Sequence, residues 1–210
     1  LSNPIRVNTT LANMGAVSSH GVIDKDKEYM VAVEYKDKLK TKCPGVEQNA
    51  GNLSGGNQQK VLLAKWMFTE PDVLILDEPT AGLDPKERII FRNLIASLSQ
   101  DCIVLLSTHI VSDIETIADD IIVMKEGKIL LHDTPQELLQ TMQNKVWQVS
   151  LPKKEALALI NSFIIVKSHN IGDCIELRIV ADTSPHPQAV NLSPDLDDLY
   201  LYYFQEGDAV

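Results

Sequence analysis

Two short stretches of the sequence carry residues suited to phosphate chemistry. Asn52–Lys60 reads NLSGGNQQK, and Val73–Asp84 reads VLILDEPTAGLD. In the first, Ser54 precedes Gly55 and Gly56 at the expected start of a helix, where unpaired N–H groups and the helix dipole favour an anion. Because glycine has no side chain, a phosphate could approach this backbone closely and also accept from the serine hydroxyl. The stretch therefore predicts an anion site, although a serine-capped helix after a flexible turn has the same pattern.

The second stretch places two acids directly after an apolar run. Val73–Leu76 is expected to be a strand buried on both faces, as in a parallel sheet. Asp77 then lies at the carboxyl end of the strand, where α/β folds bind ligands, and its oxygens suit Mg²⁺. Glu78 could orient or deprotonate an attacking water. The alternative is that the two acids only end the strand and cap the next turn.

A third candidate is His109, which follows a second apolar run, Cys102–Leu106. If the two strands are neighbours, His109 lies at the same edge as Asp77 and could contact a terminal phosphate. A histidine at a strand end is more often a polar residue with no such role.

Helices are expected on either side of the first strand. One begins just after Ser54, and another begins after Asp84, which would cap it with Pro85 at the first position. The first helix is expected to have one largely apolar face, made of Val61, Leu62, Lys65, Trp66 and Phe68. The second is expected to turn Ile89, Ile90, Phe91, Leu94, Ile95 and Leu98 inward.

Outside these elements, strands and helices are expected to alternate as far as Lys145, and a different set of elements follows. Upstream, a helix is expected over Lys25–Leu39. Downstream of His109 we expect the short helix 111–118, the hairpin strands 121–124 and 128–131, and the helix 134–142. Beyond Lys145 we expect strands at 147–151, 163–167 and 175–180 and helices at 153–160 and 196–204, the last capped by Asp195.

These elements predict an α/β fold with a small α+β appendage. We divide the chain into a lead-in over residues 1–45, a phosphate-handling core over 46–145 and an accessory domain over 146–210. In the last helix Leu196, Tyr200 and Tyr203 are expected to share one face, buried either on the module itself or on a partner.

Net charge and cysteine spacing exclude some classes of protein. The 210 residues carry a net charge of −10, which argues against nucleic acid as the main partner. The three cysteines have no metal-ligand spacing and fit reduced thiols. The start of the chain lacks the apolar segment of a signal peptide. Because the chain begins with Leu1 and not with Met, we expect it to be a fragment or a processed product.

Taken in order, these motifs resemble those of the ATP-binding cassette (ABC) ATPases over residues 46–145. LSGGNQQ resembles their signature motif, VLILDEPT their Walker B segment, AGLD their D-loop and STH their switch histidine. The resemblance implies a partial P-loop NTPase fold and the cofactors ATP and Mg²⁺.

By that resemblance, each candidate residue has an expected role. Asp77 would hold Mg²⁺, Glu78 would activate the water and His109 would contact the γ-phosphate. The remaining candidates would act across a cassette dimer, with Asp84 communicating between subunits and the signature segment clasping the opposite ATP; that segment comprises Ser54, Gly55, Gly56 and Gln58.

The resemblance has one large departure. The Walker A loop, GxxxxGK[ST], is absent from the chain, and no Gly-Lys-Ser/Thr occurs in it. We also find no convincing aromatic stacking residue or Q-loop glutamine ahead of the signature. All three lie upstream in the family, so we expect the amino-terminal part of the domain to be missing. We expect this chain alone to bind ATP weakly and to be inactive.

The chain also resembles two kinds of ABC protein. Residues 1–79 resemble the ATPases of monosaccharide importers, whereas residues 80–210 resemble ABC-2 type exporter ATPases. A recombined gene or a misassembled reading frame would produce this change near the shared DEPT motif.

The leading hypothesis is an ATP-hydrolysing subunit of an ABC transporter at the cytoplasmic face of the plasma membrane. Its expected partners are membrane-spanning subunits and a second cassette, identical or different, and not nucleic acid. Two alternatives remain. One is a non-transport ABC ATPase, which usually has long coiled coils or paired cassettes. The other is a non-catalytic remnant that donates only its signature motif.

Overall fold

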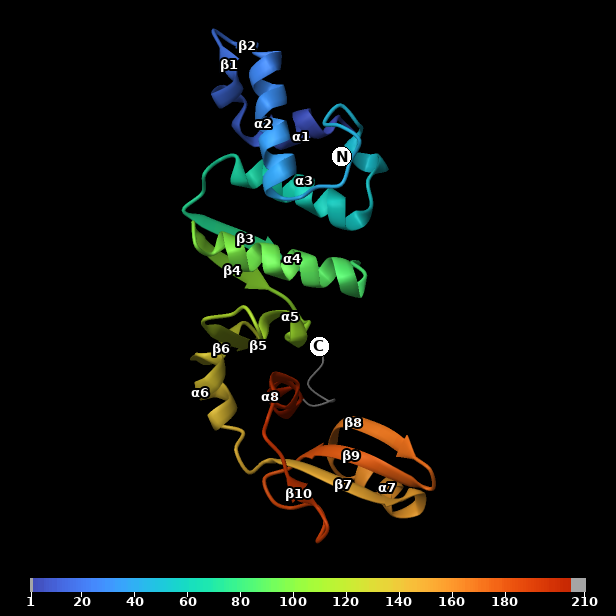
Figure 1. The fold of residues 1–210 in the computed structure, drawn as a ribbon. Helices are drawn as coiled ribbons and strands as arrows, with labels where there is room; N and C mark the ends of the chain where they lie inside the picture. Colours follow the sequence, from blue (N-terminus) through green and yellow to red (C-terminus); the bar gives the residue numbers. More distant parts are fainter. Residues whose placement is uncertain (1, 205–210) are drawn as a thin grey trace. The chain divides into compact units, whose positions relative to one another are not determined.

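The computed structural model describes residues 2–204, and the chain forms two compact units, Leu1–His109 and Ile110–Val210 (Figure 1). The three predicted domains had boundaries after residues 45 and 145, and those boundaries stay predictions. The tail that follows the last helix, residues 205–210, lies outside the described residues.

The first part of the first unit is mainly helical. Its helices are α1 (Ile5–Thr10), the 3₁₀ helix η1 (Leu11–Val17), α2 (Lys25–Lys38), the 3₁₀ helix η2 (Ala50–Asn52) and α3 (Gly55–Met67). A two-residue pairing of β1 (Ser18–Ser19) with β2 (Val22–Ile23) precedes α2. The expected helices at Lys25 and after Ser54 are confirmed, whereas α1 and η1 were not predicted.

A small apolar core and a buried ion pair join these helices. Six buried apolar side chains form the core: Ile5, Ala32, Val46, Ala50, Leu53 and Val61. Arg6 of α1 pairs with the buried Glu28 of α2, and its Nε also donates to Glu47 at 2.8 Å. Thr10 donates to the second oxygen of Glu28 at 3.2 Å. Glu28 is therefore the central group of a network that ties α1 to α2.

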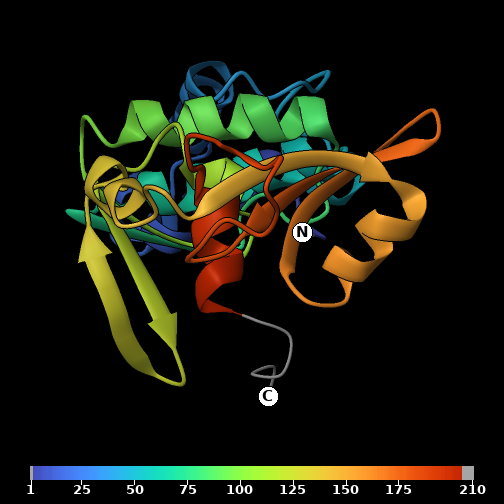
Figure 2. The ribbon, with the colours of Figure 1, turned by 90° about the horizontal axis from the view of Figure 1, so that it is seen from below.

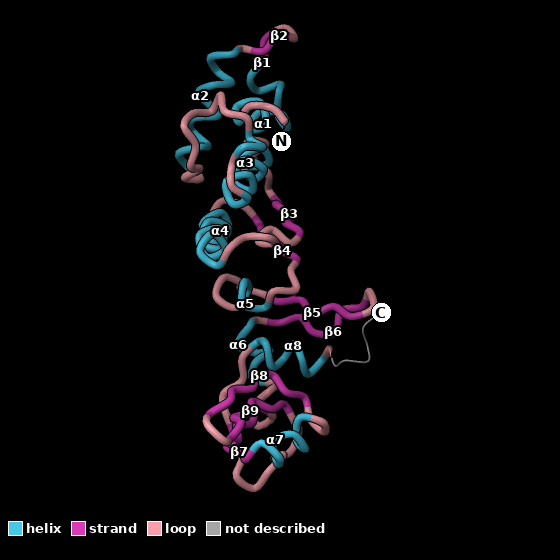
Figure 3. Tube along the Cα trace, turned by 90° about the vertical axis from the view of Figure 1, so that its right-hand side faces the viewer, coloured by secondary structure: helices cyan, strands magenta, loops and turns pink. Residues whose placement is uncertain are grey.

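A β–α–β arrangement follows. It comprises β3 (Val73–Asp77), α4 (Pro85–Leu98) and β4 (Ile103–Ser107). The two strands pair in parallel, with Val73 opposite Ile103 and Asp77 opposite Ser107. Helix α4 lies on one side of both strands (Figures 1 and 3) and buries Phe91, Ile95 and Leu98. The expected parallel sheet is confirmed in these two strands.

The expectation that these strands are buried on both faces is wrong. On β3, Leu74 is buried, but Ile75 is 69% exposed and Val73 is also exposed. On β4, Ile103 is 69% exposed and Leu105 is also exposed. Alternate residues of a strand point to opposite faces, so one face of this described sheet is apolar and open.

The helix faces were predicted only in part. In α3 the buried side chains include Val61, but Leu62 and Trp66, expected on the buried face, are exposed. The face that packs inward instead has the residues Gly56, Asn57, Lys60, Val61, Leu63, Ala64 and Met67. In α4, Ile89 is exposed rather than inward. Two buried polar residues, Asn57 and Lys60, shift the inward face of α3 away from the simple apolar stripe.

The second unit contains a hairpin, a four-stranded sheet and four helices among its described residues. The elements are α5 (Val111–Ile114), β5 (Ile121–Lys125), β6 (Lys128–Asp133), α6 (Pro135–Gln140), β7 (Val146–Pro152), α7 (Lys153–Ile160), β8 (Ile164–Ile171), β9 (Cys174–Val180), β10 (Val190–Asn191) and α8 (Leu196–Tyr203). The sheet is antiparallel in the order β10–β7–β9–β8, with α7 beside it (Figure 2). All these elements except β10 were predicted.

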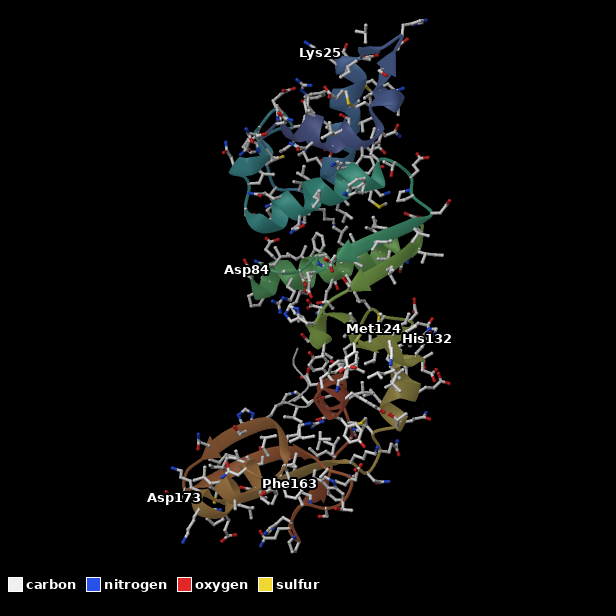
Figure 4. All side chains as sticks on the ribbon, turned by 180° about the vertical axis from the view of Figure 1, so that it is seen from behind. Lys25, Asp84, Met124, His132, Phe163 and Asp173 are labelled. Atoms are coloured by element: carbon white, nitrogen blue, oxygen red, sulfur yellow. The ribbon has the colours of Figure 1, made fainter. Side chains whose placement is uncertain are left out.

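The hairpin of β5 and β6 turns at Glu126-Gly127, both with positive φ, as expected for a two-residue turn. Along β5 more buried and exposed side chains alternate, whereas on β6 every side chain except the partly buried Leu131 is exposed. Ile121 is buried, whereas Met124 and His132 lie on the exposed strands (Figure 4).

Helix α8 packs within its own unit. Leu196 and Leu199 are buried in a cluster with Met142, Val146 and Val180, among others. Asp195 and Asp198 form a capping box, and the buried Asp198 accepts from Arg178 Nε at 2.8 Å and from its Nη2 at 2.6 Å. Of the three residues expected on one buried face, Leu196 is buried and Tyr203 packs partly buried against this cluster, whereas Tyr200 is 38% exposed. Leu199 is buried as well.

Within residues 2–204, no helix combines the length and the apolar character that crossing a membrane requires.

Candidate functional site

The pairing of β3 with β4 brings their carboxyl ends to one edge. Because Asp77 lies directly opposite Ser107, the serine hydroxyl donates a hydrogen bond to the Asp77 carboxylate. We predicted that His109 lies at the same edge as Asp77 if the two strands are neighbours. Strands β3 and β4 pair directly, so the condition is met.

Glu78 leaves the strand in an unusual backbone conformation. Its φ is +45°, in the left-handed region that a residue with a side chain rarely adopts. Its N–H donates to the Ser107 carbonyl at 2.9 Å, which holds the turn against β4. In this backbone conformation the Glu78 side chain contacts the residues that follow β4.

Three donors then meet the Glu78 carboxylate. The backbone N–H of His109 donates to Oε1 at 3.0 Å, and the ring Nδ1 of His109 lies 2.7 Å from the same oxygen. The hydroxyl of Thr108 donates to Oε2 at 3.3 Å. An ionised carboxylate only accepts, so the His109 proton is on Nδ1 and Nε2 is left for another group.

These contacts lower the pKa of the Glu78 carboxyl. The hydrogen bond from the His109 ring is the largest cause, and the backbone bond from His109 acts in the same direction. Both favour the charged form of the acid. Glu78 is thus held ionised and oriented, as a group that accepts a proton from water must be.

The glycine-rich stretch forms the start of α3. Ser54 is the N-cap residue in its backbone conformation, but its side chain makes no capping hydrogen bond. Its hydroxyl instead accepts from the Asn57 side-chain amide at 2.8 Å, while Asn57 Oδ1 accepts from the Lys42 N–H at 2.8 Å. The N–H groups of the first turn are therefore not capped by this serine.

The neighbouring candidates differ in their surroundings. Gln58 turns back and donates to the Leu53 carbonyl at 2.8 Å, which supports the loop before the helix. Gly55 has open space around its Cα, whereas Gly56 lies against Glu87 of α4. Close packing of α3 on α4 is therefore a second reason for a glycine at position 56.

Asp84 lies at the start of α4 (Figure 4) and caps it, as predicted. Its Oδ1 accepts from the Glu87 N–H at 2.9 Å, and Pro85 is the first helical residue. This cap accounts for Asp84 structurally, and its exposed position leaves it accessible to a partner.

Asp77 offers a partial site for a magnesium ion. No group of three or more His, Cys, Asp or Glu that could hold a metal occurs among residues 2–204. One carboxylate oxygen with a serine hydroxyl beside it fits a Mg²⁺ that keeps its waters and arrives with a nucleotide phosphate. The residues present therefore fit a shared ion rather than a closed metal site.

Residues 6–81 match the family model described as ABC transporter. This stretch includes the glycine-rich turn and both acids of the β3 edge. Over this stretch the chain matches the ABC transporter family.

Two curated relatives of the chain are named for the transport of a sugar. The chain is 40% identical over 142 residues to the L-arabinose transport ATP-binding protein AraG of Geobacillus stearothermophilus, which covers 67% of this chain and 28% of that protein. It is 39% identical over 127 residues to the ribose import ATP-binding protein RbsA of Roseobacter denitrificans, covering 60% of this chain and 25% of that protein. The chain thus spans about a quarter of the length of these relatives.

Solved ABC cassettes share the fold. The cassette MJ1267 has a TM-score of 0.57 at 21% identity over 67% of this chain and 58% of its own. The cassette MJ0796, a dimer bound to ADP and Pi, has a TM-score of 0.52 at 20% identity over 64% of this chain and 57% of its own. The expected partial P-loop NTPase fold is confirmed.

The resemblance of residues 80–210 to ABC-2 type exporters gains no support from these comparisons. Because the match to AraG covers 67% of the chain, the similarity to sugar importers extends beyond residues 1–79.

Four residues in or beside this site had no role assigned to them from the sequence. Ser107 and Thr108 hold the two acids, and Asn57 and Glu87 pack beside the glycine-rich turn. Ser107 and Thr108 could have been found from their place in the STH motif, because parallel pairing of the two strands brings this motif beside Asp77 and Glu78. The other two depend on helix packing, which has no comparable local pattern.

Proposed function

We propose that this chain is the part of an ABC transporter ATPase that supplies the signature helix and the hydrolytic edge. The observation that carries the proposal is the meeting of Asp77, Glu78 and His109 at the end of the β3–β4 pair. The sugar-import relatives support a role in the uptake of a monosaccharide. The proposed setting is the cytoplasmic face of a membrane, beside membrane-spanning subunits.

In this proposal, the residues of the edge have separate tasks. Glu78, ionised and held by His109, accepts the proton of the attacking water. Nε2 of His109, which the contact with Glu78 leaves available, would donate to the terminal phosphate when protonated. Asp77, steadied by Ser107, would hold Mg²⁺. When bound, that ion neutralises charge on the phosphates.

The signature helix serves the opposite nucleotide. The uncapped N–H groups at the start of α3, with Gly55 leaving the approach open, would contact the γ-phosphate of ATP on a second cassette. Such a site is complete only in a dimer, and the dimeric state of MJ0796 supports this arrangement.

This chain needs a phosphate loop from elsewhere. Its sequence contains no GxxxxGK[ST], so the amides and the lysine that hold the β- and γ-phosphates must come from a segment outside these 210 residues. The open apolar face of β3 and β4 is consistent with further packing against such a segment.

The test is to join this chain to a GxxxxGK[ST]-bearing segment and to compare ATP turnover with that of the Glu78→Gln variant. We expect turnover to fall about 10²–10⁴-fold while ATP binding persists, because only the proton acceptor is lost. The control Glu34→Gln changes an exposed acid of α2 and should leave turnover unchanged. Equal turnover in Glu78→Gln and the parent would assign the base elsewhere. A folded joined protein that binds ATP without turnover would favour the non-catalytic alternative.

A further inference from the structure

Helices α3 and α4 approach each other closely where Gly56 faces Glu87. A Cβ atom placed on Gly56 would lie 2.6 Å from Glu87 Oε2, 3.1 Å from its carboxyl carbon and 3.3 Å from its Cβ. The first distance is shorter than real Cβ contacts allow. The Cβ of Glu87 is also close, but the shortest contacts are with its carboxylate, so a side chain at position 56 would require the carboxylate to move.

The contact is specific to one of the two glycines. The nearest atom to a Cβ placed on Gly55 is Leu83 Cδ2, at an ordinary 4.0 Å. Gly55 therefore has room for a side chain and Gly56 does not. Access for a phosphate could require a glycine at both positions. Close packing against Glu87 requires one only at position 56.

Glu87 is fixed at its own backbone by the turn that starts α4. Its N–H donates to Asp84 Oδ1 at 2.9 Å, which is the cap of the helix. One residue thus joins the Asp84 cap, through its backbone, to the first turn of α3, through its side chain.

The charge of Glu87 also acts on a second residue of α3. Lys60 is only 4% exposed and donates to the Lys40 carbonyl at 3.2 Å. Burial lowers the pKa of Lys60, and the negative charge of Glu87 opposes this effect. Glu87 therefore meets α3 sterically in its first turn and electrostatically in its second.

We propose that Glu87 is a positioning residue that holds the glycine-rich turn of α3 at a fixed separation from the Asp84 turn, so that the two segments respond as one unit. Gly56 is then required because any side chain there would displace Glu87. Use of this unit to couple the signature helix to Asp84 at a dimer interface rests on the proposed function; the contact itself does not.

The experiment measures amide hydrogen exchange in the full chain without nucleotide. Gly56→Ala should speed exchange about tenfold in the peptides covering both 54–58 and 84–88, the effect of forcing Glu87 from its rotamer. Peptides from α2 should be unchanged. Gly55→Ala, the matched control, should leave both peptides as slow as in the parent chain.

Rescue variants separate size from charge. Adding Glu87→Asp to Gly56→Ala withdraws the carboxylate by one methylene and should restore slow exchange in both peptides. Adding Glu87→Gln keeps the length and should not restore it. If Gly56→Ala alone fails to fold, the double variant decides: a folded double variant supports the proposal, and an unfolded one overturns it.

Three further results would overturn the proposal. They are faster exchange confined to 54–58, a uniform increase that includes α2, and no rescue by Glu87→Asp. Since no nucleotide is present, none of these results depends on whether the chain takes part in ATP hydrolysis.

Discussion

His109 binds Glu78 through two atoms, with its backbone N–H 3.0 Å and its ring Nδ1 2.7 Å from the same carboxylate oxygen. The two residues follow neighbouring parallel strands, and the bonds lock the end of β3 to the end of β4. The carboxylate is held charged by its neighbour, which leads to a prediction about its titration.

Replacing His109 with alanine should raise the pKa of the Glu78 carboxyl toward its ordinary value of about 4.3. The reason is that the ring hydrogen bond, the largest cause of the lowered pKa, is removed. Carbon-detected NMR titration of the Glu78 carboxyl measures the change, with His132→Ala, an exposed histidine of β6, as the control. An identical Glu78 titration in His109→Ala and the parent chain would contradict the assignment.

The same lowered pKa gives the direction of the pH effect on folding. Because the Glu78 pKa is lower in the folded chain than in the unfolded one, its stabilising contribution is present above the unfolded pKa. It is lost as the pH falls through the folded pKa. The parent chain should therefore lose more stability than Glu78→Gln on acidification below about pH 4.

The left-handed backbone of Glu78 predicts an order of stability between two variants. Glu78→Gly and Glu78→Ala both lose the carboxylate contacts, but only glycine adopts φ of +45° without strain. Glu78→Gly should be more stable than Glu78→Ala by about 1 kcal/mol in urea unfolding. If the alanine variant is as stable, the turn is not strained in solution.

Much of this edge could be predicted from the sequence. An apolar run ending in Asp-Glu and a second one ending in Ser-Thr-His are local patterns, and parallel pairing brings their ends together. The hydrogen bonds of Ser107 and Thr108 could not be predicted with the same ease, because they depend on the register that places Asp77 opposite Ser107. The positive φ of Glu78 has no residue signal, since glutamate is not a residue typical of that conformation.

Breaking the buried ion pair of the first unit should destabilise the chain. Arg6→Met leaves the Glu28 carboxylate buried without its guanidinium, and we expect a loss of about 3 kcal/mol in the free energy of unfolding. Glu47→Gln is the control, because Glu47 is exposed and its pairing with the same arginine should contribute less than about 1 kcal/mol. Urea unfolding of both variants checks this, and equal losses would contradict the central position of Glu28.

The last helix should behave as core and not as a free docking face. Leu199→Ala removes a buried side chain and should cost about 2–5 kcal/mol, measured by urea unfolding. Tyr200→Ala changes a partly exposed ring and should cost much less. A small effect for Leu199→Ala would contradict the core role and favour contact of this helix with a partner.

Helices α8 and α3 show why apolar periodicity alone does not predict which face of a helix is buried. In α8 the aromatic residues suggested the buried face, but Asp198 is drawn inward by Arg178, and this places Leu196 and Leu199 in the core. In α3, Asn57 and Lys60 are buried because backbone groups near Lys40 and Lys42 bind them. Apolar periodicity cannot detect inward polar residues whose partners lie elsewhere in the chain.

We propose that this chain supplies part of an ATPase site and needs a phosphate loop to hold nucleotide. Calorimetric titration of MgATP tests it most directly, first into the chain alone and then into the chain joined to a GxxxxGK[ST]-bearing segment. We predict no binding in the low-micromolar range for the chain alone and micromolar binding for the joined protein. Low-micromolar binding of MgATP by the chain alone would contradict the account.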